Sequence, residues 1–285
     1  MHPFNSIKAI VFAVSFSVTI QSQSFGQTLF VTSPDSVQIA YEVHGRGTPA
    51  LVFVHGWSCD RGYWKGQIKP FSQDFKVVAV DFAGHGESGL GRKSWTIESF
   101  GADVAAVVKK LNLQRVILIG HSMGSNVIAE AAQQLPGRVA GLVMVDQYND
   151  LGEGWKPEAV QALAARFRTN FVDSVSAFVR SMFLPNSDRL LVDQVAADMS
   201  SAPPAIALDA LVYTLNYSRQ MPRTLDELKL RVVALNAGNT PTDVASMERH
   251  GVQVMTMPGV SHFLMMENPE GFNLLLKSAI NKLVQ

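Results

Sequence analysis

Residues 115–126 read RVILIGHSMGSN, and this stretch decides the fold. Residues 116–119 are four consecutive aliphatic residues, a pattern typical of a strand that is buried on both faces. The motif Gly120-His121-Ser122-Met123-Gly124 follows, and a helical pattern then continues to Pro136. The stretch therefore predicts a strand, a sharp turn and a helix, with Ser122 at the turn.

Gly120 and Gly124 have a steric role in such a turn. A sharp turn between a parallel strand and its helix forces the central residue into a strained backbone conformation, and side chains two positions before and after it would collide. The turn presents the Ser122 hydroxyl at the carboxyl edge of the sheet, over the positive end of the helix. An ordinary glycine-rich turn is the alternative, but the flanking strand and helix favour a reactive serine.

The rest of the chain alternates between strand and helix patterns. Helical spacing of apolar residues is present at residues 98–111, 242–250 and 269–283. Further strands are predicted at residues 29–32, 37–43, 50–54, 76–80, 141–145, 231–236 and 252–257. This alternation predicts an α/β fold with a mostly parallel sheet that is covered on both faces.

The alternation stops at residues 147–228, which are helical in pattern throughout. Many of their apolar residues fall on one helical stripe, namely Phe167, Phe171, Val175, Phe178, Val179, Met182 and Phe183. We interpret this insertion as a helical cap over the sheet edge, between two core segments at residues 27–146 and 229–285. Most of the stripe is expected to pack between cap and body, and some of it to face a pocket above Ser122.

Residues 1–26 have the pattern of an export signal. Lys8 lies in a short polar start, and residues 9–20 form a mostly apolar run. Ser24 and Gly26 place small residues where a signal peptidase cleaves, so we expect cleavage after Gly26. A membrane anchor is the alternative, but a span needs roughly 20 apolar residues and this run is shorter. We therefore expect a secreted or periplasmic protein without a stable membrane anchor.

The composition excludes some partners and some chemistry. Lys plus Arg equals Asp plus Glu at 24 each, and no basic run is interleaved with aromatic residues, so a nucleic-acid partner is not expected. Cys59 is the single cysteine, which excludes an intramolecular disulfide. We expect Cys59 to be a small buried residue, because no base is paired with it. The seven histidines have no metal-ligand spacing, so neither a metal nor a cofactor is predicted.

A neutral serine hydroxyl needs an adjacent base to become a nucleophile. His262 lies in the loop after the last predicted strand, where its side chain can reach back across the sheet edge to Ser122, and we expect it to be that base. The backbone N–H groups of Met123 and Trp57 are the candidates for an oxyanion hole, because donors must point at the developing negative charge. His55 and His121 are near, but their placement is wrong for the base.

With these motifs the chain resembles the serine hydrolases of the α/β-hydrolase fold. The similarity rests on His55-Gly56-Trp57, Asp81-x-x-Gly84-x-Gly86-x-Ser88, Gly120-x-Ser122-x-Gly124 and Gly259-x-x-His262. It covers about residues 29–285, and is looser in the helical insertion. The resemblance implies an α/β-hydrolase fold, with a mostly parallel doubly wound sheet and an inserted helical cap. It implies little about the substrate.

The chain departs from the family pattern at the third member of a triad. In the family an aspartate usually follows the strand that is predicted here at residues 231–236, but Gly238 or Asn239 holds that position. Two other aspartates could orient the base.

Asp146 and Asp243 are the two candidates for this acid. Asp146 follows the strand predicted one earlier, a position that some members of the fold use. Asp243 is close to the usual position, but it also suits a helix start with Thr240 as cap and Pro241 as first residue. We favour Asp146 and keep Asp243 as the alternative.

The sequence therefore predicts an exported serine hydrolase that cleaves carboxylic esters of small molecules. Ser122 would attack, His262 would transfer the proton, and Asp146 would orient His262. The alternative is a ligand-binding receptor or signalling protein on the same fold with slow or no turnover. Neither the substrate nor the oligomeric state follows from the sequence.

Overall fold

The computed structural model describes residues 26–285, and its frame is an eight-stranded sheet in the order β1-β2-β4-β3-β5-β6-β7-β8. β1 and β2 run antiparallel to their neighbours, and the other strands are parallel. The strands are β1 Leu29–Thr32, β2 Gln38–His44, β3 Ala50–Val54, β4 Val77–Val80, β5 Val116–His121, β6 Val139–Val145, β7 Val232–Ala237 and β8 Val252–Met257. The predicted α/β class and mostly parallel sheet are confirmed.

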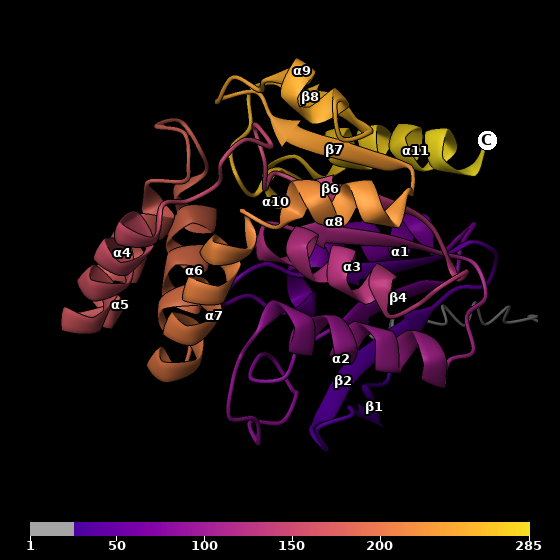
Figure 1. Cartoon of the computed structure of the whole chain (residues 1–285), viewed down its shortest axis with the longest axis horizontal. Helices are drawn as coiled ribbons and strands as arrows, with labels where there is room; N and C mark the ends of the chain where they lie inside the picture. Colours follow the sequence, from indigo (N-terminus) through magenta and orange to yellow (C-terminus); the bar gives the residue numbers. More distant parts are fainter. Residues whose placement is uncertain (1–25) are drawn as a thin grey trace, which may run out of the picture.

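Helices cover both faces of this sheet (Figure 1). α2 and α3 pack against each other and α8 packs on α3, while α1 and α11 contact each other on the opposite face. The body helices are η1 Arg61–Trp64, α1 Lys65–Phe71, α2 Ile97–Lys110, α3 Met123–Gln133, α9 Val244–Glu248, α10 Leu264–Glu267 and α11 Pro269–Val284. The central strands are buried between the two layers, which explains their continuous apolar sequence.

Five helices lie between β6 and β7 in the sequence. They are α4 Pro157–Thr169, α5 Phe171–Arg180, α6 Arg189–Ser200, α7 Pro204–Tyr217 and α8 Met221–Leu228. α4 to α7, hereafter the cap helices, lie beyond one end of the sheet, whereas α8 lies beside α3 on the body (Figure 1). The division of the chain at residues 147 and 228 into core and cap remains a prediction, as does the export signal, which falls almost entirely outside the described residues.

The apolar stripe predicted as one helical run is divided between two helices. Asn170 leaves the helical conformation with φ −148° and ψ 88°, and its side chain accepts a hydrogen bond from the N–H of Asp173. Asparagine competes well for such N-cap contacts, so α4 ends there and α5 begins at a new angle. The single-stripe prediction was therefore wrong at this position, although Phe167 and Phe171 on either side are both buried.

Hydrogen bonds join the cap helices to the body at several points. The Tyr63 hydroxyl donates to Asp198 of α6 at 2.6 Å, and the Trp57 indole N–H donates to the Ala207 carbonyl of α7 at 2.7 Å. The N–H of Trp95 donates to Asp209 of α7 at 2.9 Å. These contacts hold the cap helices in one position over the carboxyl ends of the strands.

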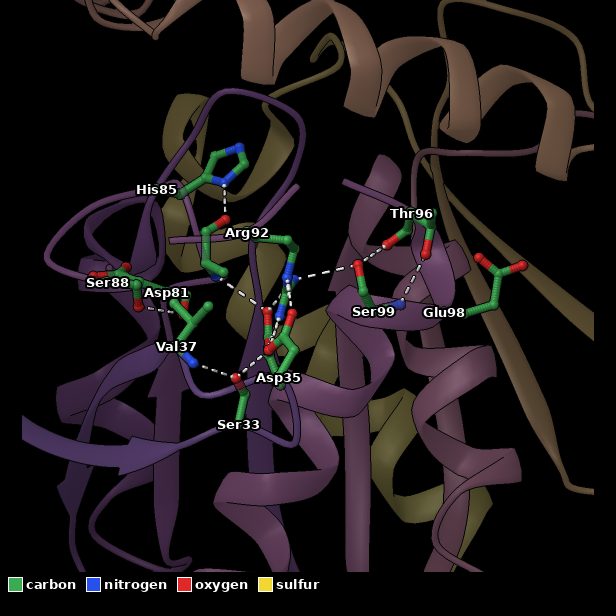
Figure 2. Close-up of polar contacts among 12 residues, drawn as sticks. Ser33, Asp35, Val37, Asp81, His85, Ser88, Arg92, Thr96, Glu98 and Ser99 are labelled. Atoms are coloured by element: carbon green, nitrogen blue, oxygen red, sulfur yellow. Dashed lines mark hydrogen bonds and ion pairs between the residues drawn. The ribbon is translucent and has the colours of Figure 1, made fainter. Parts of the chain in front are cut away.

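The connection from β4 to α2 is held by a buried guanidinium (Figure 2). Arg92, whose side chain is 3% exposed, donates to Asp103 of α2 at 2.6 Å and to Asp35 of the β1–β2 turn at 2.6 Å. Asp103 also accepts from the N–H of Ala83 at 3.1 Å. A buried charge is stable only when it is paired and hydrogen-bonded, and here both conditions are met. The network fixes the connection that carries Trp95 to the cap.

The two glycines beside Ser122 are required by close backbone contacts. A Cβ atom on Gly120 would lie 2.2 Å from the carbonyl oxygen of Gly124, as the collision argument predicts. A Cβ on Gly124 would instead lie 2.5 Å from the carbonyl oxygen of His55 and 2.6 Å from that of Val54. Gly124 is therefore also needed because the start of α3 packs against the end of β3.

We predict that Gly124→Ala destabilises the protein severely. The added methyl meets backbone oxygens that cannot rotate away, so the expected loss in the free energy of unfolding is about 3 kcal/mol or more. The measurement is a urea titration followed by circular dichroism. Gly91→Ala is the matched control, because a Cβ there meets no atom within 4 Å. Equal unfolding midpoints for the two variants would contradict this account of the turn.

Candidate active site

Ser122 occupies the turn between β5 and α3 with a strained backbone. Its φ is 51° and its ψ is −124°, a conformation that costs about 1–3 kcal/mol for a residue with a side chain. The turn is held from both sides, because the Ser122 N–H donates to the Val145 carbonyl at 2.8 Å and the Ser122 carbonyl accepts from the Ser125 N–H at 2.7 Å. The strain places the serine at the rim of the sheet, where its side chain lines a cavity.

His262 and Asp146 are in direct contact. The imidazole Nδ1 lies 2.8 Å from Asp146 Oδ2, and Asp146 Oδ1 accepts from the Ala237 N–H at 2.6 Å. A carboxylate only accepts, so this contact assigns the proton to Nδ1 and leaves the lone pair on Nε2. The structure thus brings together three of the residues predicted from sequence, because Ser122 and His262 line the same cavity.

Asp243, the alternative acid, lies elsewhere and has another role. Its carboxylate caps α9 by accepting from the N–H of Ser246 at 2.9 Å, and its own N–H donates to the Asn149 carbonyl at 2.7 Å. The predicted cap at Thr240 is therefore wrong, because the helix begins at Val244. The aspartate that contacts His262 is Asp146.

The proposed oxyanion donors lie on either side of the serine turn. Met123 is the first residue of α3, so its N–H has no acceptor within the helix and is available to a ligand. Trp57 lies in the turn after β3 and lines the cavity of Ser122. Its ring is fixed by a stacked contact with Phe167, with ring centroids 5.9 Å apart, in addition to its bond to Ala207.

His121 contacts the base loop, a role that the sequence analysis did not find. Its Nε2 lies 2.9 Å from the backbone carbonyl of His262, and the two rings have centroids 4.7 Å apart. Burial lowers the pKa of His121 well below its usual value, so the ring stays neutral and donates one N–H. His121 thereby fastens the loop of His262 to the turn of Ser122. The only sequence signal was its position directly before the nucleophile.

The other buried histidines are structural. His55 Nδ1 lies 2.8 Å from the Gly56 carbonyl, and its Nε2 accepts from the Phe82 N–H at 3.2 Å. Burial lowers the pKa of His85 to about 4, and its Nδ1 lies 3.1 Å from the Ala83 carbonyl. Both rings are neutral members of the body.

The cavity above Ser122 has a volume of about 220 Å³ and mostly apolar walls. Its apolar lining comes from the body, from the cap helices and from the segments that join them, and includes Trp57, Trp155, Phe178, Met182, Met199, Leu211, Leu215 and Phe263. Phe178 and Met182 are thus the members of the predicted stripe that face the cavity. Cys59 also lines it, but burial raises the pKa of its thiol well above the usual value, so the thiol is protonated and unreactive at neutral pH.

Residues 26–285 lack two further features. No group of three or more His, Cys, Asp or Glu side chains is arranged to hold a metal ion there. No helix in the same range is both long and apolar enough to cross a bilayer.

Known proteins resemble the chain over most of its length. The model of the alpha/beta hydrolase family matches residues 51–273. A non-heme haloperoxidase from Rhodococcus erythropolis is 36% identical over 118 residues, which is 41% of this chain and 43% of that protein. A pimeloyl-[acyl-carrier protein] methyl ester esterase from Methylococcus capsulatus is 32% identical over 171 residues, which is 57% of this chain and 64% of that protein.

A solved structure matches the whole fold. It is described as Est816, an N-acyl homoserine lactone degrading enzyme, and is 25% identical with a TM-score of 0.74. The match covers 87% of this chain and 98% of that one. By contrast, the chain spans between 31% and 66% of the length of the curated relatives that it matches by sequence.

Proposed function

The chain belongs to the alpha/beta hydrolase family, and we propose that it is an exported serine hydrolase that cleaves carboxylic esters. The proposed nucleophile is Ser122, the proposed base is His262, and the proposed acid is Asp146. The substrate is a small molecule, and no cofactor takes part in the proposed reaction.

One contact supports this proposal most directly. His262 is held through Nδ1 by a carboxylate, with its other nitrogen free, and it lines the same cavity as a serine on a strained turn. A base held in this tautomer can accept the serine proton and later return it to a leaving group. The names of two similar proteins, an esterase and a lactone-degrading enzyme, are consistent with ester chemistry.

The proposed reaction has two halves. Ser122 Oγ attacks the ester carbonyl carbon while its proton moves to His262 Nε2, and the carbonyl oxygen becomes an oxyanion that accepts from the N–H groups of Trp57 and Met123. The carbon–oxygen bond to the alcohol then breaks, and His262 gives the alcohol its proton. Water next attacks the acyl-enzyme, again with His262 as base, and releases the acid and the free serine. Asp146 stabilises the imidazolium in both halves.

Labelling of Ser122 tests the proposal. We expect a fluorophosphonate probe to label the folded protein stoichiometrically and to leave Ser122→Ala unlabelled, with intact-protein mass spectrometry as the measurement. Ethyl acetate hydrolysis should be lost in the same variant. A folded protein that neither labels nor hydrolyses the ester is instead a ligand-binding protein on this fold.

The acid is tested by a pair of matched substitutions. Asp146→Asn should lower kcat by about 10⁴-fold, because the amide stabilises the wrong tautomer of His262 and no longer stabilises the imidazolium. Asp243→Asn should stay within a few-fold of the wild type, since asparagine also caps helices well. Both variants should keep the wild-type circular dichroism spectrum. A large loss in Asp243→Asn alone would assign the acid to Asp243.

Export is proposed from residues 1–26. The apolar run at residues 9–20 and the small residues at Ser24 and Gly26 support it. When the full chain is expressed in a bacterium, we expect the mature protein in the periplasm or medium to begin at Gln27, as read by N-terminal sequencing. Cytoplasmic protein that retains Met1 would contradict the proposal.

A further inference from the structure

A second, larger cavity adjoins the cavity of Ser122. It has a volume of about 520 Å³ and is lined by the segment at residues 147–156 together with parts of α4 and α7. The two cavities share four lining residues, Gln147, Trp155, Thr214 and Leu215. The two cavities are therefore neighbours, separated only by these four side chains.

The two cavities differ in volume, so they hold substrate groups of different size. The inner cavity of about 220 Å³ lies below the roughly 300–1,000 Å³ usual for ligand pockets, while the outer one falls within that range. An apolar cavity of about 150 Å³ is known to hold a benzene molecule. The inner cavity accordingly has room for a short group next to the ester, and the larger part of the substrate belongs in the outer cavity.

The two cavities also differ in chemistry. The inner lining is dominated by aromatic, leucine and methionine side chains, whereas the outer lining carries the carboxylates of Asp150 and Glu153 and the ammonium of Lys156. Within residues 26–285, neither Glu153 nor Lys156 is in an ion pair, so both remain available to a ligand. Charges of both signs favour a neutral ligand with many hydrogen-bonding groups over an apolar one.

The position of Gln147 decides which part of the ester enters the outer cavity. Gln147 directly follows Asp146, which holds His262, so the outer cavity begins on the side of the base. The base returns its proton to the alcohol oxygen, and the alcohol therefore leaves on that side. Trp57, the proposed oxyanion donor, and His262 both line the inner cavity and not the outer one, so the outer cavity adjoins the base only through Gln147.

The segment at residues 147–156, which lines the outer cavity, is held in place by hydrogen bonds in the absence of a ligand. The N–H of Leu151 donates to Ser246 Oγ and the N–H of Trp155 to Ser218 Oγ, each at 3.0 Å. The side chain of Asn236 donates to the Tyr148 carbonyl at 2.8 Å. A wall that is fastened before the ligand arrives loses less conformational entropy on binding.

We propose, on the basis of the proposed ester hydrolysis, that the substrates are short-chain acyl esters of neutral polyhydroxylated alcohols such as sugars. The short acyl group occupies the cavity at Ser122, and the polyol occupies the outer cavity beside Glu153 and Lys156.

A matched pair of acetates tests the alcohol side. Methyl 6-O-acetyl-glucoside and cyclohexylmethyl acetate differ mainly in ring hydroxyls, and we expect kcat/KM to favour the glucoside by about 10-fold or more, equivalent to one or two net hydrogen bonds. Ethyl esters of increasing acyl length test the acyl side, and kcat/KM should fall beyond about six carbons. Equal or reversed preference for the two acetates overturns the proposal, as does a rise in kcat/KM with long acyl chains.

Two variants test whether the preference for the glucoside acetate depends on the outer cavity. Ala159 lines only the outer cavity, so Ala159→Trp should remove the glucoside preference and leave ethyl acetate hydrolysis within about two-fold. The double variant Glu153→Ala, Lys156→Ala should reduce the preference several-fold without the risk of added bulk. An unchanged preference in both variants overturns the proposal. If the chain is not a serine hydrolase at all, the wild type shows neither ethyl acetate hydrolysis nor fluorophosphonate labelling. That outcome differs from a serine hydrolase that lacks the glucoside preference.

Discussion

The register between β5 and β6 is the constraint on which the site depends. His121 of β5 is paired with Val145 of β6, so the residues that follow, Ser122 and Asp146, leave the sheet side by side. Both have positive φ, at 51° and 49°, and each is anchored to the next strand, through Ser122 N–H to Val145 and Asp146 N–H to Leu235. Parallel strands lie about 4.8 Å apart, which leaves room for one imidazole to reach both side chains. A slip of one residue in this register would separate them.

The helical insertion contributes apolar side chains to the site that is formed at the ends of the strands. The strand ends and the loops after them supply the polar groups, while α5, α6 and α7 supply part of the apolar wall around them. Since hydrogen bonds from Tyr63, Trp57 and Trp95 attach α6 and α7 to the body, this part of the wall and the polar groups share one rigid frame. The serine thereby borders a fixed, mostly apolar surface, and electrostatic contacts are stronger beside such a surface than in bulk solvent.

Much of the frame could be predicted because its signals are local. β1, β3 and β8 begin and end where the apolar patterns predicted, and Ser122 stands at the predicted turn. The contact of Gly124 with the end of β3 was not predicted, since β3 is distant in sequence. The choice between Asp146 and Asp243 stayed open for the same reason: it depends on which strand end the His262 loop crosses. The contact of His121 with the His262 carbonyl and the closeness of the two cavities arise from tertiary packing, for which no sequence spacing exists.

The hydrogen bonds between the cap helices and the body affect how fast different parts of the site can move. Lifting α6 and α7 away from the body would break several hydrogen bonds at once, and collective motions of that kind take microseconds to milliseconds. Trp155, by contrast, is 45% exposed at the junction of the two cavities, and exposed side chains reorient within nanoseconds. The shape of this junction therefore changes on a much shorter timescale than the position of the cap helices.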